Sequence, residues 1–220
     1  MNISVYVDGE SHYERTLALW RSIHGEQAAL TDAVYAPNGS SYSEFPEPRN
    51  PPTIVLPHLK FFWDTQYGRL GPALLRSAHI DNAAYFTTFT GDDAAYHSAC
   101  VEIRTLRFDP QVVRERAQLS SRRADRLNGH GVIEKAKGVD TSLAVRALED
   151  GYRGIYDMCY LFTSDVDFLP MIRALQRVGR KVIVFGYQGG LSERSELEYV
   201  PDGFVNLTNY VHNTYQQKPA

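Results

Sequence analysis

Apolar and polar residues alternate along this chain in blocks that switch between the spacing of strands and the spacing of helices. Five segments are apolar, aromatic or β-branched and predict strands: Asn2–Val7, Ala84–Thr88, Val101–Phe108, Tyr160–Phe162 and Lys181–Phe185. Helices are expected to follow the first and the fourth of these strands. This alternation favours an open α/β sheet, in which ligands bind beyond the carboxyl ends of the strands.

Apolar residues at helical spacing predict three helices. One follows the first strand, one lies within residues 134–151, and one follows the strand Tyr160–Phe162. Gly151 is expected to stop the second helix. Pro170 suits the first turn of the third helix, and Gly179 suits the position just past its end.

Four aspartates stand where these elements meet. Asp8 follows the first strand, and Asp140 precedes the apolar face of the second helix. Asp165 and Asp167 flank Val166, directly after the fourth strand. Two carboxylates spaced in this way can converge on a hard cation through their oxygen atoms. The junctions therefore predict a ligand site at the edge of the sheet.

Helix capping is the alternative explanation for these aspartates, because Asp is among the favoured N-cap residues. By that interpretation Asp167 caps the third helix, and Asp140 taken alone is better explained as a cap than as a ligand. Ser11 and Glu14 form an S-x-x-E capping box, so Asp8 is expected to have no capping role. Four aspartates at separate junctions are hard to explain as independent caps.

Three blocks of sequence resemble the signature blocks of a known family. They are VYVDGES at residues 5–11, KGVDTSLAVRAL at 137–148 and LFTSDVDFLPMIRALQRVGRKVIVFG at 161–186. Together they resemble NYN-domain proteins, in the LabA-like branch of the PIN-like nuclease superfamily. A looser similarity continues to residue 207, where Asp202 and Phe204 resemble the last strand of the family. The resemblance implies an α/β fold with a PIN-like (Rossmann-like) parallel sheet flanked by helices.

The resemblance also implies a metal-dependent endoribonuclease that hydrolyses RNA. The catalytic and metal-binding positions of the family match Asp8, Asp140, Asp165 and Asp167, which would surround Mg²⁺ or Mn²⁺. Ions held by carboxylates neutralise phosphate charge, activate a water molecule and stabilise the leaving oxygen, without a His or Cys nucleophile. The sequence contains no H-E-x-x-H pair, Walker loop or G-x-S-x-G motif that would point to other chemistry.

Substrate contacts are expected from Ser11, Ser164, Lys135 and Lys137. Ser11 stands where the family often has Asn, and its hydroxyl can still donate a hydrogen bond to a water or a phosphate. Ser164 stands where the family usually has Gly. Val166 occupies a position where a small polar residue is common, and it removes a polar contact. These departures bear on catalysis more than on the fold.

A local surplus of positive charge precedes the Asp140 block. Residues 104–137 contain nine Lys and Arg against four Asp and Glu, a surplus of five, although the whole chain has a net charge of −3. This stretch could follow a phosphate backbone beside the metal. The alternative is a solvated, charged helix face over residues 111–127. Lys135 and Lys137 lie nearest to the acidic block and are the better candidates for contacts with RNA.

Two other functions stay open. A degenerate NYN domain would bind RNA or a protein partner without cutting, and the departures at Ser11 and Val166 are the features that favour it. A phosphatase-like hydrolase would use the DxD motif of Asp165 and Asp167 as nucleophile and acid. That second class expects Gly after the motif, whereas Phe168 follows here.

The composition suits one folded domain. With 220 residues, 43% of them apolar, the chain can bury a full core. We predict a single domain over residues 1–220, in which residues 25–82 are an insertion or elaboration. That region is rich in proline and carries an aromatic cluster, which either packs in the core or stacks on unpaired bases.

The remaining features concern the environment of the protein. Cys100 and Cys159 are too few for a disulfide framework or a zinc site, and Cys159 is expected to be a buried free thiol. The start, MNISVYV, leads directly into a strand without a basic leader or a long apolar run. We therefore expect a cytoplasmic protein with no membrane contact. Whether it forms a homo-oligomer is left open.

Overall fold

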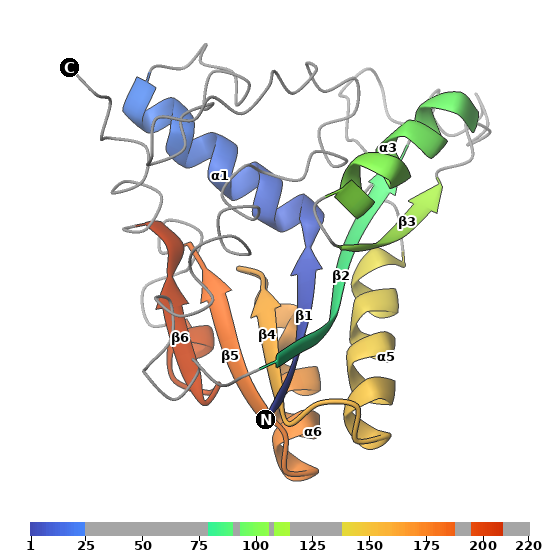
Figure 1. Cartoon of the computed structure of the whole chain (residues 1–220). Coiled ribbons are helices and arrows are strands. Elements are labelled where there is room, and N and C mark those ends of the chain that lie inside the picture. The colour runs from blue at the N-terminus through green and yellow to red at the C-terminus, as the bar shows by residue number, and fades with distance from the viewer. Residues whose placement is uncertain (25–78, 90–92, 106–107, 115–137, 188–194, 209–220) are drawn as a thin grey trace, which may run out of the picture.

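The computed structural model describes residues 1–24, 79–89, 93–105, 108–114, 138–187 and 195–208. Within these residues, six strands form one parallel sheet in the order β3-β2-β1-β4-β5-β6 (Figure 1). Their bounds are β1 Asn2–Asp8, β2 His79–Phe89, β3 Asp109–Arg114, β4 Met158–Phe162, β5 Lys181–Gly186 and β6 Gly203–Asn206. The predicted α/β fold with a parallel sheet is thereby confirmed.

The strand order places β1 at the centre of the sheet. From β1 the chain builds outward through β2 to β3, and it then crosses back to place β4 on the other side of β1. Val7 of β1 pairs with Phe162 of β4, so the carboxyl ends of these two strands lie side by side. The strand order reverses between β1 and β4, and ligands of open α/β sheets bind at such a reversal.

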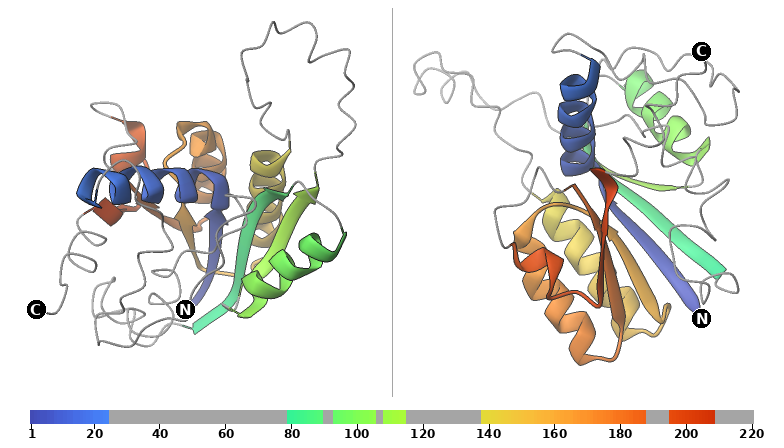
Figure 2. Two further views of the ribbon diagram at one scale, coloured as in Figure 1. Left: turned by 90° about the horizontal axis from the view of Figure 1, so that it is seen from above. Right: turned by 90° about the vertical axis from the view of Figure 1, so that its left-hand side faces the viewer.

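Helices cover both faces of the sheet (Figures 1 and 2). The described helices are α1 Gly9–His24, α3 Asp93–Thr105, α5 Val139–Tyr152 and α6 Leu169–Arg177, together with the short 3₁₀ turns η6 Val166–Phe168 and η8 Glu196–Glu198. The α5 and α6 helices pack on one face of the sheet. Ile103 of α3 and Leu19 of α1 pack with the core on the other face.

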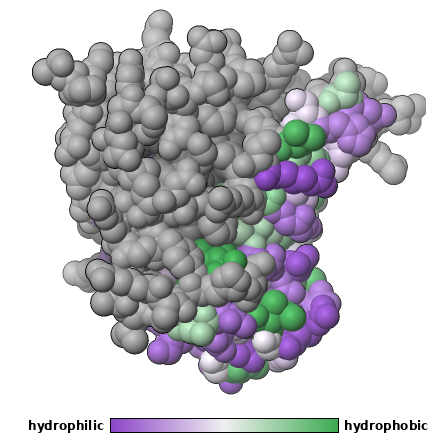
Figure 3. Space-filling model, viewed as in Figure 1, coloured by the Kyte–Doolittle hydropathy of each residue, from purple (hydrophilic) through white to green (hydrophobic). Residues whose placement is uncertain are grey.

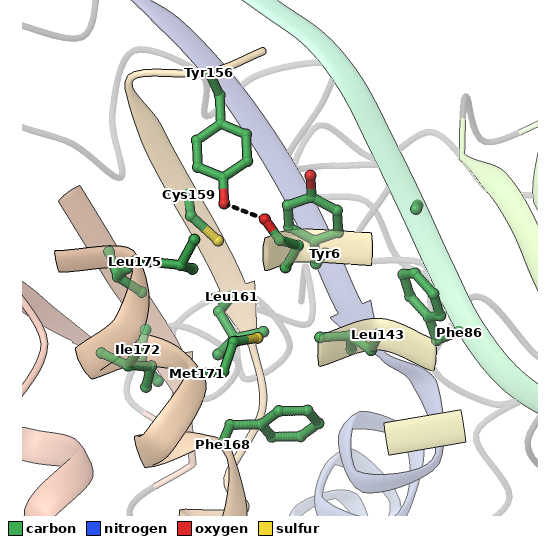
Figure 4. Close-up of a cluster of buried hydrophobic side chains, with 14 of the residues drawn as sticks. Tyr6, Phe86, Leu143, Tyr156, Cys159, Leu161, Phe168, Met171, Ile172 and Leu175 are labelled. Atoms are coloured by element: carbon green, nitrogen blue, oxygen red, sulfur yellow. Dashed lines mark hydrogen bonds between the residues drawn. The ribbon is translucent and has the colours of Figure 1, made fainter. Parts of the chain in front are cut away.

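Alternation along each strand divides the core into two layers. In β1, Val5 and Val7 point into the layer shared with α3, whereas Tyr6 points toward α5. Figure 4 shows the second layer, in which Leu143 of α5 and Leu175 of α6 meet the strand residues. Each fully buried side chain of this kind contributes about 1.5–3 kcal/mol to folding. Burial on both faces accounts for the continuous apolar runs in the strands.

A buried polar cluster ties α5 to the central strands. Asp150 Oδ2 accepts hydrogen bonds from Tyr6 Oη at 2.8 Å, Asn82 Nδ2 at 3.2 Å and Arg146 Nε at 2.7 Å. Burial, with smaller contributions from its neighbours, raises the pKa of Tyr6 above its usual range. Tyr6 therefore acts as a neutral donor, and the buried charge of Asp150 is matched by Arg146.

The segment Val101–Phe108 was predicted to be a strand, and this prediction is wrong. The chain is helical to Thr105 in α3, and the next strand is β3, Asp109–Arg114. Ala99, Cys100 and Ile103 are buried at helical spacing, and this amphipathic pattern overrides the shorter alternation. The alternative of a helix over residues 111–127 is also wrong for 111–114, which belong to β3, and 115–127 lie outside the described residues.

Of the two glycines predicted to end helices, one does so and the other does not. Gly179 has a φ of +79° just past α6, as expected, and Pro170 lies in the first turn of that helix. Gly151 does not stop α5, which continues to Tyr152. A Cβ on Gly151 would lie 2.5 Å from Leu175 Cδ2, so its small size serves the packing of α5 against α6.

Other predictions meet the structure in part. Cys100 and Cys159 are both buried and free, as predicted for Cys159. Most of the predicted insertion, residues 25–78, lies outside the described residues, and residues 79–82 belong to β2. No helix in the described part of the chain is long and apolar enough to cross a membrane.

The visible described surface mixes apolar and hydrophilic side chains (Figure 3). Exposed large apolar residues include Val101, Val145 and Tyr152. Exposed apolar residues interspersed in this way are normal for a folded surface.

Candidate functional site

Asp8 ends β1 at the edge of the sheet and is only 3% exposed. Its Oδ2 accepts a hydrogen bond from Thr163 Oγ1 at 2.8 Å, and its Oδ1 accepts one from the backbone N–H of Ser11 at 3.2 Å. The expectation that Asp8 has no capping role was wrong. Because α1 begins at Gly9, Ser11 lies inside the first turn, and Asp8 accepts the N–H that an N-cap residue satisfies.

Gly9 allows this turn to lie close to β2. A Cβ at this position would lie 2.5 Å from the Tyr85 ring and 2.7 Å from the carbonyl oxygen of Phe86. Tyr85 Oη also donates a hydrogen bond to the Gly9 carbonyl at 3.4 Å. The glycine after Asp8 is therefore required by close approach of the neighbouring strand.

Thr163 joins two of the aspartates and was missed by the sequence analysis. Its buried hydroxyl donates to Asp8 Oδ2 and accepts from the backbone N–H of Asp165 at 3.1 Å. Both hydrogen-bonding roles of the hydroxyl are thereby used. Sequence pattern alone marked Thr163 only as the residue after a strand, and the pairing of β1 with β4 shows that it lies beside Asp8.

The turn after β4 places Asp165 and Asp167 differently from the prediction. Asp165 Oδ1 accepts the backbone N–H of Asp167 at 2.9 Å, so Asp165 caps the 3₁₀ turn η6. The prediction that Asp167 caps the helix was wrong, because this turn lies between the strand and α6. Asp167 is exposed, whereas Asp165 is half-buried.

Asp140 lies in the first turn of α5 and is exposed. The N-cap residue is Gly138, with a φ of +124°, and it has no side chain that could accept a helix N–H. The interpretation of Asp140 as a cap was therefore wrong. A carboxylate in the first helical turn still interacts favourably with the helix dipole.

The electrostatics of Asp8 connect three of the predicted residues. Burial raises the pKa of Asp8 to about 7, hydrogen bonds from Thr163 and Ser11 oppose this rise, and repulsion from Asp140 and Asp165 adds to it. The fold thus brings the carboxylates of Asp140 and Asp165 within electrostatic reach of Asp8. At neutral pH, a cation beside Asp8 would offset the free-energy cost of burying its negative charge and would reduce the repulsion from the neighbouring carboxylates.

The two predicted serines form hydrogen bonds within the protein. Ser11 Oγ accepts the backbone N–H of Ser164 at 3.4 Å, and Ser164 Oγ accepts the backbone N–H of Tyr187 at 3.0 Å. Ser164 is 8% exposed. The two predicted lysines, Lys135 and Lys137, lie outside the described residues.

The chemistry of the carboxylates suits a hard divalent cation. In the part of the chain that the structure describes, no three Asp, Glu, His or Cys side chains are grouped closely enough to hold a metal ion. Mg²⁺ does not need such a group, because it is usually bound through one or two carboxylates, with waters and substrate phosphates completing its shell. The Asp8 carboxylate accepts a hydrogen bond from Thr163, which also binds the backbone N–H of Asp165, and the two aspartates supply the carboxylate oxygens that Mg²⁺ or Mn²⁺ prefers.

Comparisons with known proteins agree with this architecture. The family model of the NYN domain matches residues 59–208, a range that includes Asp140, Asp165 and Asp167 and leaves out Asp8. A crystal structure of a protein of unknown function from Vibrio parahaemolyticus RIMD 2210633 is similar, at 17% identity and a TM-score of 0.55, over 94% of this chain and 92% of that chain. At that identity the similarity shows the fold alone, and the curated proteins contain no match. The chain belongs to the NYN-domain family, within the PIN-like nuclease superfamily.

Proposed function

We propose that this protein is a metal-dependent endoribonuclease of the LabA-like branch of the NYN family. The observation that carries the proposal is the position of Asp8. It is a buried carboxylate at the reversal of strand order, and it experiences repulsion from Asp140 and Asp165. Such an arrangement is costly to the fold in the absence of a ligand, and perturbed carboxylates in this setting are typical of functional sites.

Each carboxylate has a role in this proposal. Asp8 and Asp165 would hold Mg²⁺ or Mn²⁺, and Asp140 and Asp167 would add further carboxylates for the ion. When bound, the ion neutralises the scissile phosphate and lowers the pKa of an attacking water. Thr163 holds the Asp8 carboxylate toward the turn that carries Asp165.

RNA is the proposed substrate. Lys135 and Lys137 immediately precede the Asp140 block in the sequence. We assign them phosphate contacts as point charges, since a lysine ammonium offers donors without the planar fork of arginine. Their binding contribution should therefore decrease as salt concentration rises.

A binding module without catalysis is the second candidate. The observation that favours it is that both carboxylate oxygens of Asp8 already accept hydrogen bonds within the protein. Such a protein would bind RNA or a protein partner through the same edge of the sheet. Family membership lends no support to the third class, a DxD phosphatase.

Cleavage of labelled RNA with and without Mg²⁺ or Mn²⁺ tests the proposal. Asp8→Asn and Asp165→Asn should abolish cleavage while the fold is retained. Asp157→Asn is the matched control, because Asp157 is exposed and bonds to the backbone of Asn2 at the opposite edge of the sheet. RNA binding without cleavage in either metal would favour the binding module instead.

A further inference from the structure

Two serines link three strand ends beside the candidate site. Ser11 lies in the first turn of α1 and its Oγ accepts the N–H of Ser164, which follows β4. Ser164 Oγ in turn accepts the N–H of Tyr187, which follows β5. The N–H groups of Ser164 and Tyr187 lie beyond the strands, so the serine hydroxyls supply acceptors where the sheet no longer does.

Ser11 also connects this chain of bonds to the first aspartate. Its N–H donates to Asp8 Oδ1, while its hydroxyl holds the residue that precedes Asp165. A second bridge runs from Asp8 Oδ2 through Thr163 Oγ1 to the N–H of Asp165. Asp8 and Asp165 are thus joined by two separate paths of hydrogen bonds. Two paths restrict a relative movement that one path would allow.

Tyr187 closes the arrangement against α1. Its hydroxyl hydrogen bonds with Thr16 Oγ1, and its ring lies 5.6 Å from the ring of His12, measured between centroids. Thr16 Oγ1 also bonds to the carbonyl of His12 at 2.8 Å. His12, Thr16, Ser164 and Tyr187 are all buried. Hydrogen bonds in such surroundings are strengthened by the low local dielectric.

We infer that Ser11 and Ser164 are positioning residues, which set the place of Asp165 relative to Asp8 instead of contacting RNA. Ser164 is 8% exposed and its oxygen is engaged by Tyr187, which suits an internal role better than a phosphate contact. This inference rests on the proposed function, because it concerns the two carboxylates assigned to the cation.

Mn²⁺ binding to the full chain, measured by calorimetry, tests this role without RNA. Ser11→Ala and Ser164→Ala should each weaken Mn²⁺ affinity about 3–10-fold, and the double variant should lose less than the sum of the two effects, because the bonds act as one unit. Ser11→Thr, which keeps the hydroxyl, should restore most of the affinity. Ser22→Ala is the matched control, since Ser22 lies exposed on the same helix and donates a local hydrogen bond to the carbonyl of Leu19.

RNA cleavage kinetics separate positioning from substrate contact. A positioning role predicts a lower kcat with an unchanged KM for RNA in both alanine variants. A higher KM with unchanged Mn²⁺ affinity would overturn the inference in favour of direct contact with RNA. A lower melting temperature with unchanged Mn²⁺ affinity and kcat would overturn it in favour of a purely structural role.

Crystal structures of the parent protein and of Ser11→Ala, both without metal, test the positioning role without relying on metal binding. The inference requires that Asp165 moves relative to Asp8 when the Ser11 hydroxyl is removed. An unmoved Asp165 would overturn it. Failure of the parent protein to bind Mn²⁺ would overturn the proposed function, and the structural comparison would still decide whether these serines position the carboxylates.

Discussion

Asp8 combines nearly complete burial with repulsion from two neighbouring carboxylates, and the fold bears the cost of this charge. Its folded-state pKa of about 7 lies above its ordinary value of 3.8. Between these two pH values the folded protein retains a proton that the unfolded chain has already lost. The contribution of Asp8 to stability therefore falls as pH rises from about 4 to about 7, and it stays low above that range.

Asp8→Asn should remove this dependence. At pH 8 without metal, we expect the free energy of unfolding to rise by about 1–3 kcal/mol, and at pH 4 we expect little change. Asn can still cap α1, so loss of the cap should not mask the gain. Urea unfolding of parent and variant at several pH values checks this. An equal effect at pH 4 and pH 8 would contradict the assigned pKa.

Thr163→Val should affect both stability and ionisation. The Thr163 hydroxyl is the hydrogen-bond partner of both Asp8 Oδ2 and the N–H of Asp165, and the substitution removes it from both. The free energy of unfolding should fall by about 1–3 kcal/mol. The pKa of Asp8 should rise further, because the Thr163 hydrogen bond lowers it. Carboxyl ¹³C NMR titration measures this shift. Thr163→Ser is the control and should keep the parent pKa.

At the scale of the elements, two glycines permit close packing for different reasons. Gly9 brings the start of α1 against β2, where a Cβ would meet a ring and a backbone carbonyl. Gly151 brings α5 against α6, where a Cβ would meet the end of the Leu175 side chain and the hydroxyl of Tyr156. A backbone atom within a sheet cannot move aside to make room for a new Cβ, whereas the end of a flexible side chain can.

Gly9→Ala should therefore destabilise the protein more than Gly151→Ala does. For Gly9→Ala we expect a loss of about 2–3 kcal/mol from overpacking. For Gly151→Ala we expect a smaller loss, because Leu175 can move and alanine has a helix propensity about 1 kcal/mol better than glycine. Urea unfolding of both variants tests the order. A reversed order would show that the α1 turn adjusts more readily than the α5–α6 contact.

At the scale of the whole molecule, the proposed function couples metal binding to folding. Mn²⁺ at a concentration 100-fold above its Kd should stabilise the parent by about 2.7 kcal/mol at pH 8. The effect should shrink at pH 5, because the cation must then displace a proton from Asp8. Thermal melts with and without Mn²⁺ measure it. Equal stabilisation of Asp8→Asn would show that the ion binds elsewhere.

The sequence by itself determined the local features of this protein. The apolar runs of β1, β4 and β5, the helical spacing of α6 and the turn at Gly179 are properties of neighbouring residues, so periodicity and backbone preference predict them. The placement of four aspartates at element junctions is local in the same sense. The segment from Val101 to Phe108 was misassigned because its spacing suits two periods, and packing of α3 against β3 decided between them.

Only the tertiary structure decided which of these junctions meet. The order of strands brings Thr163 beside Asp8, and no local pattern encodes that pairing. Asp8 and Asp165 act as caps because of where each helical segment begins. That starting point depends on the tertiary contacts of the preceding turn as well as on the residues in the turn. The raised pKa of Asp8 arises from burial and from carboxylates distant in the sequence, because desolvation and repulsion depend on separation in space.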